Sequence, residues 1–363
     1  MKKATLFFVQ YSLLIVTITS CSQKMKEQYY WDTAASAPTN YPAQIYSGHL
    51  ITGDTPTSGY AYLPFDEDIN PSQGLGANDA ASSDRATGKP PKSLDITWLS
   101  FTEKKSYSGI FKLDHKKIED LMLNCQERPI WNKKTNKTTL FKDNDFVIST
   151  GLIPGGIVIL YVFTQTDVTI VGRFQAHEDK NVDWKTAYAY MKDNSEINKL
   201  IEIVNKDLPE QVKEQIASGT IPIGYWDDWF KTYQYTPMVA LEDKVETLRF
   251  NYLNGEYETI FLSLKKNIMP IRERAVPKDI NIVWHDANDR RMETDVFFDE
   301  KKVRALFAQT KPNEKIQFVF TIDRNTTPRA TQGITIKLKT ADKEIDLKEA
   351  ITSQESFVKE LPY

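Results

Sequence analysis

The sequence has few residues that could form disulfides or bind zinc. It contains two cysteines, Cys21 and Cys125, and four histidines in 363 residues. None of the histidines has a second histidine four positions later or a cysteine at a zinc-ligand spacing, so we expect no metal site. Cys21 is expected to carry a lipid, as its position after an apolar N-terminal segment indicates. That leaves Cys125 as the only other cysteine. We therefore expect no intramolecular disulfide, even in an oxidising compartment.

The chain also lacks a surplus of basic charge. It carries 46 lysines and arginines against 49 acidic residues, a net charge of −3. Residues 1–20 include two lysines and no acid, so their removal would change the net charge to −5. Without a basic stripe to displace counterions from phosphates, nucleic acid is excluded as the expected partner.

The N-terminus has the pattern of a lipoprotein signal peptide over residues 1–20. Lys2 and Lys3 precede an apolar run from Leu6 to Ile18, which is too short for a membrane span. The run ends in Ile18-Thr-Ser-Cys21, a branched apolar residue and two small residues before a cysteine. We predict cleavage before Cys21 and lipidation of its thiol, so that the membrane is a partner through the N-terminal lipid. An ordinary secretory peptide with an incidental cysteine is the alternative.

The residues after Cys21 indicate a destination in the cell envelope. Ser22 replaces the aspartate that retains many lipoproteins in the inner membrane, so we expect the outer membrane. Lys24 and Lys26 accompany only one acid, Glu27, which favours the periplasmic side over the cell surface. The leaflet stays open.

One segment of the chain recurs. Residues 91–111 align with residues 277–297, with Pro91, Ile96 and Trp98 opposite Pro277, Ile282 and Trp284. Each copy alternates apolar and polar residues, as a half-buried strand does, and continues into a second strand and a helix that begins after Asp114 or Asp299. This repetition predicts an internal duplication.

We therefore predict an α+β fold of two related units, each a mainly antiparallel sheet with a helix. The expected parts are the signal peptide (1–20), a tether (21–40), a first unit (41–180), a helical bridge with an aromatic-rich segment (181–240), and a second unit (241–363). Residues 65–92 are rich in Asp, Asn, Ser, Gly and Pro and predict a long mobile loop. Residues 126–145, which include Trp131 and several lysines, are expected to form a long connection after the first helix.

Several local patterns have a structural interpretation that outweighs a chemical one. The glycine-rich residues 151–156 lead into a strand without a following Gly-Lys-Ser/Thr, so we expect a tight turn and no phosphate site or cofactor. Cys125 lies on the apolar stripe of a predicted helix, with Ile118, Leu121 and Met122, and is expected to be buried and inert. Two acidic clusters with histidine are expected in solvated turns, with a metal-assisted hydrolase as the alternative; they are His177, Glu178 and Asp179, and His285, Asp286 and Asp289.

The most unusual segment is aromatic and lies at residues 221–235. The candidate ligand surface within it is Tyr225, Trp226, Asp227, Asp228 and Trp229, because rings can stack on sugars while carboxylates bond their hydroxyl groups. Packing is the favoured interpretation, since Trp226, Trp229, Phe230 and Tyr233 have the spacing of one stripe of a short helix.

Phrases spread over most of the chain after about residue 40 support a resemblance to a known family: residues 91–98, 105–107, 111–113, 151–158, 171–176, 221–227, 254–256 and 274–278. The chain resembles envelope lipoproteins of Gram-negative bacteria that are grouped only as a domain of unknown function. The resemblance implies a secreted, lipid-anchored protein and assigns no catalytic residue. We predict a non-enzymatic binding or interaction module with a protein or glycan partner. A glycan-binding or glycan-processing lipoprotein and an immunity-type inhibitor of a toxin are the alternatives.

Overall fold

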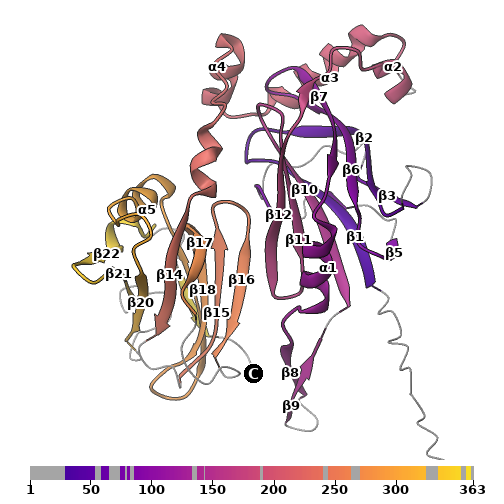
Figure 1. Ribbon diagram of the computed structural model, residues 1–363. Helices are drawn as coiled ribbons and strands as arrows, with labels where there is room; N and C mark the ends of the chain where they lie inside the picture. The colour runs from indigo at the N-terminus through magenta and orange to yellow at the C-terminus, as the bar shows by residue number, and fades with distance from the viewer. Residues whose placement is uncertain are drawn as a thin grey trace, which may run out of the picture.

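A computed structural model places two sheet-rich units side by side (Figure 1). It describes residues 29–360 except 54–58, 65–73, 78–79, 82–85, 133–136, 143, 189–190, 240–243, 263–269, 324–333 and 353–356. The predicted signal peptide, residues 1–20, and Cys21 lie outside these residues. Among the described residues, no helix is both long and apolar enough to cross a membrane.

The first unit is a sandwich of two sheet layers with one helix. One layer has the strand order β12-β11-β10-β1, with the short strands β4 and β5 also paired to β1, and the other has the order β13-β7-β6-β2-β3. Apolar side chains of both layers form a common core with the helix α1. The elements are β1 (Tyr29–Ser36), β2 (Ala43–Ile51), β3 (Tyr60–Tyr62), β4 (Ala80–Ala81), β5 (Ala86–Gly88), β6 (Ser93–Ser100), β7 (Lys105–Lys112), α1 (His115–Leu123), β8 (Arg128–Asn132), β9 (Lys137–Phe141), β10 (Asp145–Ile153), β11 (Ile157–Phe163), β12 (Asp167–Gln175) and β13 (His177–Glu178).

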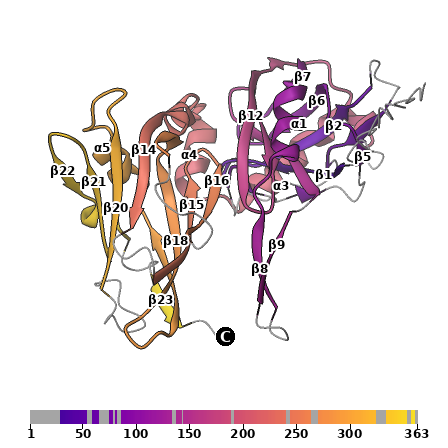
Figure 2. The same ribbon diagram turned by 60° about the horizontal axis from the view of Figure 1, so that its bottom comes forward.

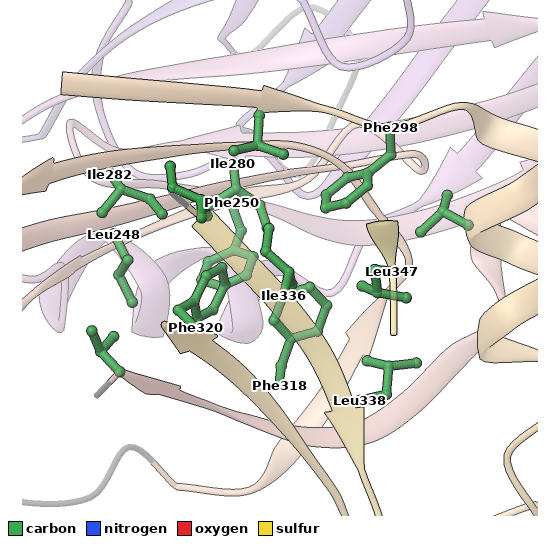
Figure 3. Packing of buried hydrophobic residues seen from close by; sticks show 14 of the residues in the cluster. Leu248, Phe250, Ile280, Ile282, Phe298, Phe318, Phe320, Ile336, Leu338 and Leu347 are labelled. Atoms are coloured by element: carbon green, nitrogen blue, oxygen red, sulfur yellow. The ribbon is translucent and has the colours of Figure 1, made fainter. Parts of the chain in front are cut away.

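The second unit is also a sandwich. Its layers have the orders β16-β15-β18-β19-β23 and β17-β14-β20-β21-β22. Figure 3 shows Leu248 and Phe250 of one layer facing Phe318 and Phe320 of the other across the core. The elements are β14 (Thr232–Val239), β15 (Val245–Tyr252), β16 (Tyr257–Phe261), β17 (Arg272–Ala275), β18 (Pro277–His285), β19 (Arg291–Phe297), α5 (Glu300–Phe307), β20 (Ile316–Ile322), β21 (Ile334–Lys339), β22 (Glu344–Asp346) and β23 (Phe357–Glu360).

The two units pair corresponding strands in the same way. The first strand of each pairs in parallel with the strand that follows the helix, β1 with β10 and β14 with β20. The remaining antiparallel pairs also correspond, for example β2–β6 with β15–β18 and β7–β13 with β19–β23. Both predicted helix caps are confirmed, since the Asp114 and Asp299 side chains accept hydrogen bonds from the backbone N–H groups of Lys117 and Lys302.

An edge of each unit joins the two into one continuous sheet. Strand β12 of the first unit pairs antiparallel with β16 of the second, with Asp167 opposite Glu258 and Val168 opposite Tyr257. The resulting layer contains eleven strands drawn from both units. Close packing of two turns supports this pairing, because Gly76 of the first unit lies directly against the backbone of Gly255 in the β15–β16 turn.

The predicted helical stretch consists of α2 (Trp184–Ala187), the 3-10 turn η1 (Asn194–Glu196), α3 (Ile197–Lys206) and α4 (Glu210–Ser218). Trp184, Ile197 and Ile201 pack against Leu99 and Phe101 of the first unit. The helices α2 and α3 therefore cover one end of the first unit, whereas α4 stands apart from them on the side toward the second unit (Figure 1).

The structure differs from the prediction in two segments, the predicted tether and the predicted long loop. Residues 29–36, which we placed in the tether, form the buried strand β1, because Trp31 and Ala35 belong to the first core. The loop predicted over residues 65–92 contains β4 and β5, which pair with β1. Polar composition did not reveal these strands, because they are only two and three residues long.

The contact between the two glycine turns gives a stability prediction. A Cβ atom on Gly76 would lie 2.2 Å from the carbonyl oxygen of Gly255, whereas one on Gly219 would meet nothing within 4 Å. Both glycines have left-handed φ angles, 76° and 68°. Alanine at either site should cost about 1 kcal/mol of backbone strain. Gly76→Ala should cost a further ~2 kcal/mol for displacing the facing turn. Urea unfolding of both variants measures the difference, and equal losses would contradict the close contact.

Candidate functional site

The aromatic segment forms a short 3-10 helix, η2 (Tyr225–Phe230), between the two units. Gly224 precedes it with a left-handed φ of 87°, and Lys231 ends it in an extended conformation. Tyr233 lies in β14, so the single helical stripe that we predicted from Trp226 to Tyr233 is wrong. The helix ends early because β14 begins pairing with β17 at Thr232.

Trp226 packs against the β12-β11-β10-β1 layer of the first unit, on the face opposite the common core. Its ring is therefore not available to a ligand. Its side chain is 2% exposed and packs in a cluster with Leu75, Ile159 and Tyr161. The ring of Tyr41 meets it edge-on at 4.8 Å. The packing interpretation therefore holds for this ring.

The two carboxylates of η2 form ion pairs with different units. Asp227 pairs with Arg173 on β12, and the guanidinium of Arg173 also lies over the Phe230 ring. Asp228 pairs with Arg304 on α5 and with Lys231, and the hydrogen bond from Lys231 is the main cause of its lowered pKa. These carboxylates connect η2 to both sandwiches.

Tyr225 and Trp229 converge on one carboxylate of the second unit. The Tyr225 hydroxyl and the Trp229 indole N–H donate to the same oxygen of Glu300, at 2.7 and 2.8 Å. Arg304 donates to that oxygen as well, at 3.1 Å. Burial, and then the hydrogen bond to Glu300, raises the pKa of Tyr225 to about 12. Both rings are therefore held in fixed positions at the junction.

A groove of about 690 Å³ lies beside these two rings, with walls from both units. This volume is in the range of small-molecule sites. Tyr225 is 38% exposed, and Trp229 and Tyr257 are partly exposed. The polar groups are the exposed Arg249, whose guanidinium lies 4.3 Å above the Tyr257 ring, and Asp279, which accepts a hydrogen bond from Asn251. Burial raises the pKa of Asp279.

Sequence reasoning missed the second wall of the groove. Arg249 and Asn251 on β15, Tyr257 on β16 and Asp279 on β18 occupy strand positions that alternate with buried residues. Such positions have the pattern of an ordinary solvent-facing side of a sheet. They become a wall only because β16 pairs with β12. No local pattern in the sequence predicts that pairing.

The two histidine clusters have structural contacts. Glu178 pairs with Lys105, and Asp179 accepts hydrogen bonds from Ser108 and from the Asn181 backbone. In the other cluster, Asp286 binds backbone N–H groups of its turn and the Arg290 side chain, while His285 contacts Glu246. No group of three metal-ligating side chains occurs within the part of the chain that the structure describes.

The glycine-rich stretch is the tight turn that we predicted. It connects β10 to β11, and Gly155 and Gly156 both have positive φ angles, 89° and 78°. Cys125 differs in part from the prediction, since it is only partly buried and packs at the margin of the first core. The helix α1 ends at Leu123, before the cysteine.

The shared acceptor at Glu300 gives a second prediction. Glu300→Ala removes the acceptor of Tyr225, Trp229 and Arg304, so we expect the free energy of unfolding to fall by about 2 kcal/mol. The neighbouring Lys301 is exposed, and Lys301→Ala should change it by less than about 0.5 kcal/mol. Denaturant unfolding of both variants checks the difference. A Glu300→Ala protein as stable as the Lys301→Ala control would mean that the convergence on Glu300 does not hold η2.

Comparison with known proteins gives a family and no activity. No curated protein and no solved structure matches the chain. A family model matches residues 19–224, more than half of the chain, and ends directly before η2. The chain belongs to the family described as "Protein of unknown function (DUF2931)".

Proposed function

We propose that this protein is a lipid-anchored envelope protein that binds a carbohydrate in the groove between its two units. The observation that supports the proposal is the lining of that groove. Three partly exposed aromatic rings, Tyr225, Trp229 and Tyr257, stand among side chains that can donate or accept hydrogen bonds. Sugars present apolar C–H faces and hydroxyl edges, and this combination of rings and polar groups matches both.

The polar groups of the groove are prearranged, which favours tight binding. Stacking on Tyr257 holds the guanidinium of Arg249, and Asn251 and Asp279 are bonded to each other. A ligand hydroxyl or carboxylate can bond to Arg249 without ordering a free side chain. A groove of about 690 Å³ has room for a short oligosaccharide.

The carboxylates of the groove support binding better than hydrolysis. Glu300 accepts three hydrogen bonds from the protein. Glu256 accepts bonds from the Ile170 backbone and from Asn254. Glycoside hydrolysis needs one acid to donate a proton and a second to assist. Glu300 and Glu256 are bound by structural donors and are suited to holding the walls of the groove in place. Among the described residues that line the groove, Asp279, whose pKa burial raises, is therefore left without a second free carboxylate to assist it.

An internal duplication accounts for how such a groove arises. The identical pairing scheme of the two units and the recurring residues 91–111 and 277–297 support it. The family model ends at residue 224, so the second unit is, under this proposal, a diverged second copy of the same fold. Two copies joined edge to edge provide a groove that one copy lacks.

Groove variants test the carbohydrate proposal. The mature chain labelled with a fluorophore should bind a subset of an array of neutral and acidic oligosaccharides. Tyr225→Ala and Arg249→Ala should each weaken binding to the retained glycans about tenfold, the loss of roughly 1.4 kcal/mol of contact energy. Tyr60→Ala is the matched control, because Tyr60 is 46% exposed and lies outside the groove.

Unfolding curves of the three variants show whether weaker binding comes from a lost contact with the glycan or from a less stable fold. An array without retained glycans, or groove variants that bind as well as the Tyr60→Ala control, would contradict the proposal.

The lipid anchor is tested separately. Cys21→Ala removes the thiol that accepts the diacylglycerol, so labelling of growing cells with a radioactive fatty acid should mark the wild-type protein and not the variant. Mass spectrometry of the wild-type N-terminal peptide should show the added acyl mass. An unmodified Cys21 in membrane-associated protein would contradict this part of the proposal.

A further inference from the structure

The β-hairpin β8–β9 projects from the first unit and has a composition unlike the rest of the chain. Within the described residues its two strands pair only with each other, as a separate two-stranded sheet. Figures 1 and 2 both show it extending beyond the body of the unit. Residues 128–142 contain five basic residues and no acidic one, in a protein with a net charge of −3.

The hairpin also exposes large apolar side chains. Leu140 is 53% exposed and Phe141 is 44% exposed. Arg128 on the facing strand lies over the Phe141 ring, 5.6 Å from its centre. Exposed apolar residues beside basic ones, on an element that projects from the protein, are the composition of segments that enter the membrane interface.

The base of the hairpin is adjacent to the point where the N-terminal chain enters the fold. The backbone N–H of Tyr30 donates to the carbonyl of Asn144, three residues after the end of β9. Strand β1 then runs parallel to β10 with Tyr30 opposite Asp145. Tyr29 lies eight positions after Cys21, and a chain of eight steps spans at most about 28 Å. Strands of five residues are about 17 Å long.

We propose that the β8–β9 hairpin docks on the bilayer surface, with Leu140 and Phe141 in the interface and Arg128 on anionic headgroups. A lipid on Cys21 would hold this end of the first unit close to the membrane. The hairpin then adds a second contact, which determines which side of the body faces the bilayer. This orientation rests on the proposed anchor, whereas the affinity of the hairpin for a lipid surface does not.

The experiment uses the mature chain with Cys21→Ser, so that no acyl chain contributes. The protein is mixed with vesicles of phosphatidylcholine alone or of phosphatidylcholine with phosphatidylglycerol, and the bound fraction is measured by flotation. We expect binding to the anionic vesicles, weaker binding at high salt because the charges are screened, and little binding to the neutral ones. Leu140→Ser combined with Phe141→Ser should weaken the partition at least about tenfold.

Ile110→Ser is the matched control, because Ile110 is a 74% exposed apolar residue on strand β7. It should bind the vesicles as the Cys21→Ser chain does. The proposal is overturned if that chain floats with neither vesicle type, which would point to a protein partner for the hairpin. It is also overturned if the Leu140/Phe141 variant and the Ile110 control bind equally. Both results are independent of whether Cys21 is acylated and of whether the groove binds a glycan.

Discussion

The architecture depends on the junction where the edge strand β12 of the first unit pairs with β16 of the second. The ladder itself is short, with two paired positions, Asp167 with Glu258 and Val168 with Tyr257. A ladder of this length would leave the units free to pivot, and the other contacts restrain them. Trp226 is buried on the first unit, while the carboxylates beside it pair with Arg173 and Arg304 on opposite sides. The groove exists only while this junction holds.

The second unit's side of the junction contains a buried ion pair. The Glu258 and Arg274 side chains form an ion pair and are 5% and 4% exposed. The Tyr252 hydroxyl also donates to Glu258, and Arg274 also donates to the Tyr235 carbonyl. Removing either partner would leave a charge buried without compensation, which is strongly destabilising. The edge strand that joins the units is thus held by polar contacts with specific partners as well as by Ile260 in the apolar core.

The two units share a topology but differ in what they add to it. In the first, the β8–β9 hairpin is inserted between α1 and β10, and helices follow β13. In the second, the chain passes from α5 to β20 through residues 308–315 without a hairpin. The two features for which we propose a function are the β8–β9 hairpin and the groove. The hairpin lies where the units differ, and the groove lies where they meet. The hairpin stands at the end where the N-terminal chain enters, and the groove stands where the outer sides of β15, β16 and β18 meet η2.

Local patterns were sufficient for most elements and their order, but not for β1, β4 and β5, which were predicted as tether and loop. The alternation in residues 91–98 and 277–284, the caps at Asp114 and Asp299 and the glycine turn at residues 151–156 each depend on neighbours within a few positions. The side chains predicted as one ligand surface have different environments, because Trp226 is buried while Tyr225 remains partly exposed. The pairing of β12 with β16 joins residues about ninety positions apart, and its energy depends on contacts absent from either strand alone. The sequence by itself thus determined most of the strands and helices of two similar units, and only the tertiary structure decided which of their outer side chains share a groove.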